Sequence, residues 1–128
     1  MAMSSARRCY ELGRLLRRAI ETFPDQLRVV LMGSGSFSLE VWGPRIAPGK
    51  PDGVPDPDWV TSLCGYFERG ETERILNEAS EAKLLGAGNV GGELLNWIVM
   101  LGAYGEGKPL FVKPQMANGH AYAAWRRS

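Results

Sequence analysis

A short apolar run, LRVVLMG at residues 27–33, limits the possible folds of this chain more than any other stretch. Apart from Arg28 its side chains are apolar, with the β-branched pair Val29 and Val30 inside the run, and it leads into the glycine-serine turn GSGSFS. This pattern is typical of a strand that is buried on both faces. We therefore expect a sheet covered by helices, with this strand inside it.

The segments around this strand have helical spacing. Residues 6–23 place apolar side chains at helical intervals and arginines mostly on the other side, which predicts a helix packed on the core with a solvated face. The apolar positions of this helix are Cys9, Leu12, Leu16, Ala19, Ile20 and Phe23. Asp58 is a candidate N-cap for a second helix, and residues 71–85 form another helical stretch.

A last helix is expected to begin near Asn89 and to end at Gly105 and Gly107, and KPLFVKPQ and HAYAAW are candidate closing strands. The proline- and glycine-rich residues 43–60 predict a long surface loop. Because helices and strands alternate, we expect an α/β fold with helices packed on a small mixed sheet. A chain of 128 residues fits a single domain, residues 1–128.

Composition excludes several classes of function. The net charge is +1, which gives no electrostatic reason to expect nucleic acid or an anionic membrane as a partner. Two cysteines, Cys9 and Cys64, are too few for a disulfide framework and suit a reducing compartment. The stretch MAMSSARRCYELG lacks the apolar core of a signal peptide, and no apolar run is long enough to span a bilayer. We expect a soluble cytoplasmic protein.

Three familiar functional motifs are incomplete or stand in the wrong context in this sequence. GAGNVG at residues 86–91 matches a dinucleotide fingerprint, but a half-polar helical segment precedes it instead of a strand, so a tight helix-to-helix connection is expected. MGSGSFS lacks the flanking glycines of a nucleophile elbow. The single histidine, His120, and two distant cysteines do not make a structural zinc site.

Glu93 lies at the start of a strongly apolar helix, in GGELLNWIVML. A carboxylate among Leu94, Leu95, Trp97 and Met100 is expected to be at least partly buried, which is costly unless it is paired or bound to a metal. Two interpretations stay open. Glu93 satisfies nearby backbone donors or an arginine, or it is a metal ligand.

Four segments resemble the C-terminal half of the class III extradiol ring-cleavage dioxygenases, the superfamily of the protocatechuate 4,5-dioxygenase catalytic subunit. They are RCYELGRLLRRAIETFPDQLRVVLMGSGSFS, DPDWVTSLCGYFERGETERIL, GGELLNWIVMLGAYGEG and MANGHAYAAWR, in the family's order. The resemblance covers residues 6–127, and its most specific parts are RVVLMGSGSFS and ELLNW.

The resemblance implies a mononuclear ferrous site with two histidine ligands and one glutamate, open to a catecholic substrate and dioxygen. The glutamate ligand falls on Glu93. The family's acid-base histidine falls on Leu39, which cannot transfer protons, so no catalytic residue is assigned in this chain. The histidine ligands belong to the family's N-terminal half, which has no counterpart here, and His120 lies where the family places no ligand. Fe(II) is therefore expected only if a partner completes the site.

Three alternatives follow. The chain is an enzyme-derived half that acts on small aromatic compounds once a partner supplies two histidines and a base. Alternatively, it is a non-catalytic binding or structural subunit that keeps the fold, which Leu39 favours, or it is the product of a truncated gene. Because strand LRVVLMG would expose its edges without the other half, we expect a homo-oligomer or a complex with a partner chain.

Overall fold

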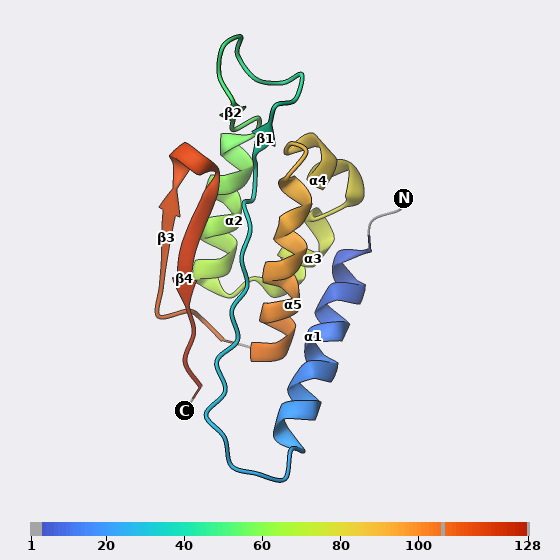
Figure 1. Cartoon of the computed structure of the whole chain (residues 1–128). Coiled ribbons are helices and arrows are strands. Elements are labelled where there is room, and N and C mark those ends of the chain that lie inside the picture. The colour runs from blue at the N-terminus through green and yellow to red at the C-terminus, as the bar shows by residue number, and fades with distance from the viewer. Residues whose placement is uncertain (1–3, 106, 128) are drawn as a thin grey trace.

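The computed structural model of the chain describes residues 4–105 and 107–127, so the first three residues of the N-terminal stretch lie outside it. The order of elements along the chain is shown in Figure 1. The helices are α1 (Ala6–Glu21), α2 (Pro57–Arg69), α3 (Thr72–Glu78), α4 (Glu81–Gly86), the 3-10 turn η1 (Gly91–Glu93), α5 (Leu94–Tyr104) and the 3-10 turn η2 (Met116–Asn118). The strands are β1 (Glu40–Val41), β2 (Asp52–Gly53), β3 (Phe111–Gln115) and β4 (His120–Ala124).

The strands form two small sheets in the described part of the chain. β1 pairs with β2, and β3 pairs with β4 from Phe111 opposite Ala124 to Gln115 opposite His120. The α/β class is confirmed, as are the two closing strands. Both sheets are antiparallel, so the expectation of one mixed sheet is wrong in that detail.

The core lies between α2, α5 and the β3–β4 hairpin. α5 buries Leu94, Trp97, Ile98 and Leu101, and α2 buries Leu63 and Phe67 among others. Phe37, from the turn before β1, is fully buried, with its ring centroid 5.7 Å from that of Phe67 and 4.8 Å from that of Trp97. The turn therefore anchors directly in the aromatic core.

α1 packs along α5 through glycines. A Cβ at Gly13 would clash with the Val99 carbonyl oxygen, and one at Gly102 would clash with the Tyr10 carbonyl oxygen. The two backbones can approach this closely only because both positions lack a side chain. This contact fixes which side of α1 faces the core.

The predicted apolar face of α1 is only partly correct. Cys9 is buried, together with Ala6 and Gly13, but Leu12 and Phe23 are 56% and 52% exposed. Leu16 is also exposed. Helical periodicity identifies an apolar side, but the described part of the chain offers nothing that covers these leucines.

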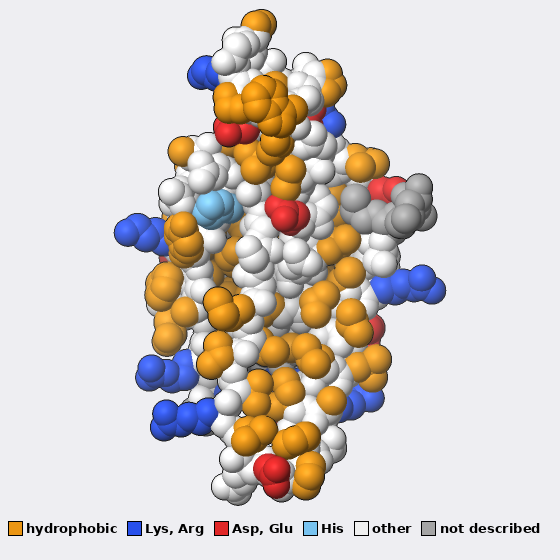
Figure 2. Space-filling view, viewed as in Figure 1, with side chains coloured by type: hydrophobic (Ala, Val, Ile, Leu, Met, Phe, Trp, Pro, Cys, Tyr) orange, Lys and Arg blue, Asp and Glu red, His pale blue; other side chains and the backbone are white. Residues whose placement is uncertain are grey.

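The predicted buried strand at residues 27–33 is wrong for this chain. These residues form no strand, and Val30 and Met32 are 80% and 92% exposed. The backbone of residues 24–33 makes no hydrogen bond with any described residue. In Figure 1 the segment runs as an extended trace from the lower end of α1 and rises beside α5 toward β1, and Figure 2 shows apolar side chains spread over this face. Within residues 4–105 and 107–127, no strand pairs with it or buries it.

The connections mostly agree with the sequence-based expectations. Asp56, not Asp58, caps α2, because its carboxylate accepts a hydrogen bond from the Trp59 amide at 3.0 Å. GAGNVG forms the tight link from α4 to η1, with Gly88 at φ +117°. No helix within the described ranges is long and apolar enough to cross a membrane.

Candidate functional site

The glycine-serine turn is bound to the first residues of α5 by three hydrogen bonds. Asn96 donates from Nδ2 to the Ser34 carbonyl at 2.9 Å, and Trp97 donates from Nε1 to the Gly35 carbonyl at 3.0 Å. The Ser36 amide donates to Oε1 of Glu93 at 3.2 Å. All three partners come from ELLNW, so the two most specific parts of the family resemblance are in direct contact.

Gly35 is required for this contact. Its φ is +143°, a conformation that side chains rarely adopt, and a Cβ there would collide with the Cβ of Glu93. The turn therefore passes directly over Glu93, with no side chain between them. The start of α5 determines the course of the turn.

A second set of bonds holds the chain beyond the turn. The Gly119 carbonyl accepts from the amides of Phe37 and Ser38 at 2.7 and 3.1 Å, and the Leu39 carbonyl accepts from the Val90 amide at 3.0 Å. Ser36 thus faces Glu93 while Leu39 faces Val90, three residues earlier. Leu39 and Glu93 lie on two segments that are bonded side by side.

Glu93 differs from its expected environment. It is exposed, although residues 33–35 pass close to Glu93, Asn96 and Met100, whereas Leu94 and Trp97 are buried in the core. Its carboxylate accepts a backbone amide, as one of the two interpretations anticipated, and it does not cap α5 with its side chain. One carboxylate oxygen is left without a described hydrogen-bond donor.

The described residues do not fit a complete iron site. Among them, no group of three or more histidine, cysteine, aspartate or glutamate side chains could hold a metal ion. His120 begins β4, is half-buried, and its ring lies edge-on to that of Tyr122 with centroids 5.2 Å apart. Gly119 brings the start of β4 beside the turn, although His120 lies far from it in sequence. Glu93 could supply one ligand, and the remainder would have to come from elsewhere.

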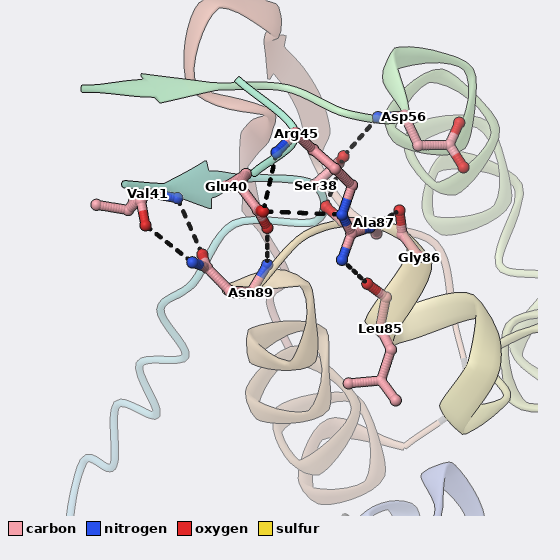
Figure 3. A network of polar contacts seen from close by, with 9 residues as sticks. All are labelled: Ser38, Glu40, Val41, Arg45, Asp56, Leu85, Gly86, Ala87 and Asn89. Carbon is pink, nitrogen blue, oxygen red and sulfur yellow. Dashed lines mark hydrogen bonds and ion pairs between the residues drawn. The ribbon is translucent and has the colours of Figure 1, made fainter. Parts of the chain in front are cut away.

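The buried carboxylate of this region is Glu40, which the sequence analysis did not identify. Glu40 is 1% exposed, accepts from the Asn89 amide at 2.6 Å and lies 3.7 Å from Nε of Arg45 (Figure 3). Arg45 also donates to the carbonyls of Leu85 and Gly86, at 2.9 and 2.8 Å. These bonds join the segment after Leu39 to the link between α4 and η1.

Two further side chains complete this network. Asn89 uses its amide group at both ends, accepting from the Val41 amide at 2.9 Å and donating to the Val41 carbonyl at 2.8 Å. The buried Ser38 hydroxyl donates to the Ala87 carbonyl and accepts from the Asp56 amide, both at 2.9 Å. No motif marks these residues, since each partner lies many positions away in the sequence. The network therefore holds Ser38 and Glu40, the residues on either side of Leu39.

The family to which the chain is similar includes all the segments that form this site. Residues 1–124 match the family model described as the catalytic LigB subunit of aromatic ring-opening dioxygenase. The match covers the turn, Leu39, Glu93 and the hairpin. The chain belongs to this family, which confirms the resemblance to the extradiol dioxygenases.

One curated relative is gallate dioxygenase of Pseudomonas putida strain KT2440, which is 32% identical over 102 residues. The aligned part is 80% of this chain and 28% of that enzyme, so the chain spans well under a third of the relative's length. No solved structure matches significantly. The chain is therefore similar in sequence to part of a ring-cleavage dioxygenase.

Proposed function

We propose that the chain provides the C-terminal half of an extradiol ring-cleavage site for catecholic compounds, with non-haem Fe(II) as the metal. In this proposal Glu93 supplies one carboxylate ligand, and two histidine ligands come from outside these 128 residues. The observation that carries it is the contact between the glycine turn and ELLNW, which leaves one Glu93 oxygen without a described partner beside the turn.

Leu39 limits the catalysis that this chain can support by itself. The family resemblance places an acid-base histidine at this position, and general acid-base catalysis contributes typically about 10²–10⁴-fold in rate. A leucine cannot supply it, so turnover requires a base from the completing chain. The second candidate, a non-catalytic binding or structural subunit, is favoured by the same residue.

The completing chain is proposed to pair with residues 24–33. The backbone of this segment has no hydrogen-bond partner among the described residues, and its side chains Val30 and Met32 are exposed. It leads directly into the turn that contacts Glu93. A neighbouring strand would satisfy the backbone and cover the apolar side chains. A second copy or a separate partner chain could provide it.

Hydrogen exchange and light scattering test the pairing. In the isolated chain, the amides of residues 27–33 are expected to exchange rapidly, whereas those of Phe37 and Ser38 are protected by the Gly119 carbonyl. On assembly, protection is expected to extend into residues 27–33. A chain that remains a monodisperse 14.1 kDa monomer at high concentration, and in the presence of its co-purifying proteins, would contradict assembly.

An anaerobic titration with ferrous iron tests the metal role. Wild type, Glu93→Gln and the control Glu11→Gln, which removes an exposed carboxylate from α1, are compared alone and with any chain that co-purifies. Saturable binding that Glu93→Gln abolishes and Glu11→Gln preserves supports the proposal. Binding that survives Glu93→Gln contradicts the ligand role, and an assembled complex without any iron binding favours the non-catalytic subunit.

If iron binds, Leu39→His provides the next comparison. A restored base is expected to raise oxygen uptake with a catechol when the remaining ligands are present. If iron is bound and uptake does not change, the role assigned to position 39 is wrong.

A further inference from the structure

A cleft rich in arginine lies at the other end of α5 from the turn and Glu93. It has a volume of about 620 Å³ and is formed by one side of α1, the C-terminal end of α5 and the chain after β4. Five arginines line it, Arg14, Arg17, Arg18, Arg126 and Arg127, together with a single acidic residue, Glu21. Two separate segments, α1 and the chain after β4, therefore contribute positive charge to one place.

The charge of this cleft is out of proportion to that of the molecule. Five arginines against one glutamate leave an excess of four positive charges, although the whole chain carries a net charge of +1. Glu106 follows the lining residue Gly105 in the sequence, and even its charge would leave an excess of arginine. Such a concentration of like charge in a concave surface attracts anions.

Some of these arginines have structural partners. Arg17 donates from Nη1 to the carbonyls of Ala103 and Tyr104, which are the last carbonyls of α5, and its Nε pairs with Glu21 at 2.9 Å. Glu21 also pairs with Arg127 at 3.2 Å. Glu21, the only described carboxylate that lines the cleft, is therefore already paired with Arg17 and Arg127.

The other arginines have no such role. Arg14, Arg18 and Arg126 form no ion pair with any residue in the described ranges, and all three are exposed. Arg14 and Arg18 are four residues apart on α1, where like charges repel each other. The Tyr104 hydroxyl donates to the Arg126 carbonyl at 2.9 Å and so ties the tail to the end of α5. An anion between these three guanidinium groups would relieve their repulsion.

We propose that this cleft binds a small multivalent oxyanion, a molecule that carries two or more carboxylate or phosphate groups. Guanidinium groups match the oxygens of both groups through paired hydrogen bonds. The cleft volume lies within the range of about 300–1,000 Å³ that is usual for small-molecule sites. Tyr10 and Tyr104 add aromatic surface, and Tyr104 also fixes the tail. The site is separate from Glu93 and does not depend on the proposed ring-cleavage function.

Calorimetric titration of the full 128-residue chain tests this, with citrate and pyrophosphate as probes at constant ionic strength and acetate as the monovalent control. We expect saturable binding of one anion per chain for citrate, pyrophosphate or both, and none for acetate. Citrate alone would identify a carboxylate site and pyrophosphate alone a phosphate site. The absence of saturable binding for both would overturn the proposal.

Variants separate a built site from general charge attraction. Arg14→Gln with Arg18→Gln is expected to weaken binding at least tenfold, and Arg126→Gln, on a different segment, is expected to weaken it as well. The matched control, Arg8→Gln with Lys50→Gln, removes two exposed charges outside the cleft and is expected to leave binding unchanged. Equal losses in the control and the cleft variants would show non-specific attraction and overturn the proposal. Circular dichroism verifies that each variant is folded.

Discussion

Residues 24–33 and residues 34–41 follow one another in the chain, yet they are bound to the rest of the molecule in opposite ways. The first stretch makes no backbone hydrogen bond with a described residue. The second is held by the start of α5, by Gly119, by Val90 and by Asn89. The boundary between them falls at the glycine turn.

This difference shows which part of the fold these residues can determine by themselves. The turn finds all its partners within the chain, because ELLNW, the α4–η1 link and the hairpin surround it. The extended stretch has apolar side chains and backbone groups without a described partner, as an internal strand requires, but the described part of the chain places no strand beside it. The turn is therefore held in place by residues of this chain, whereas the pairing of the extended stretch is part of our proposal.

The largest expected effect comes from the side chain that anchors the turn. Phe37→Ala empties a fully buried position between Phe67 and Trp97 and is expected to cost about 3–5 kcal/mol of unfolding free energy. Val30→Ala, in the extended stretch, is expected to change it by less than about 0.5 kcal/mol, since Val30 is 80% exposed. Denaturant unfolding of the two variants measures both. Similar losses would mean that the extended stretch is packed after all.

The next largest effect is expected at Gly35, which is compared with Gly33 on the other side of the boundary between residues 33 and 34. Gly35→Ala requires a side chain at φ +143° and a clash with Glu93, so a loss of about 3 kcal/mol is expected. At Gly33 the added Cβ would lie 3.2 Å from the Asn96 carbonyl oxygen and the φ is ordinary, so a loss under about 1 kcal/mol is expected. Thermal unfolding of the pair checks the order. If Gly33→Ala were the worse of the two, the described course of the turn would be wrong.

Glu40→Gln tests the network around the residue that follows Leu39. The amide keeps the shape of the side chain but removes the charge that faces Arg45 and weakens the bond from the Asn89 amide, so a loss of about 1–3 kcal/mol is expected. Glu11→Gln, on the exposed side of α1, serves as the control and is expected to be neutral. If Glu40→Gln left the unfolding free energy unchanged, this network would not be what holds Leu39 in position.

The sequence was sufficient for the elements whose pattern is local. Helical periodicity identified α1, α2 and α5, and the segment before GAGNVG correctly predicted a tight connection between helices. The predictions that failed concern neighbours. The same apolar pattern that predicts a buried strand at residues 27–33 says nothing about whether the covering elements belong to this chain.

The candidate site was predictable only in part, for a related reason. The resemblance identified Glu93 and Leu39, but the exposure of Glu93 depends on what covers one face of α5. Glu40 carries no signal, because a polar residue between Leu39 and Val41 suggests an outward position. Its burial depends on Asn89, which is distant in sequence and donates a backbone amide that any residue could provide. Pairing over such distances is a property of the fold and not of a motif.

The smallest expected effect is on the pH dependence of stability. It concerns Cys64, on the well-packed helix α2, and Cys9, on α1, which is packed on one side only. Burial raises the pKa of the Cys64 thiol on α2 to about 11, and burial also raises the pKa of Cys9 above its ordinary value. The folded state therefore favours the neutral thiol, while the unfolded chain releases the proton near the ordinary thiol pKa. The stabilisation is fully present below that ordinary value and is lost as the pH rises toward 11.

In Cys64→Ala the decline of unfolding free energy between pH 8 and pH 10.5 is expected to be shallower than in wild type. In Cys9→Ala the difference from wild type is expected to be smaller. Denaturant unfolding at stepped pH measures the three slopes. Equal slopes in wild type and Cys64→Ala would show that the α2 side of the core is open to solvent, and the contrast between the packed and the uncovered parts of the molecule would no longer hold there.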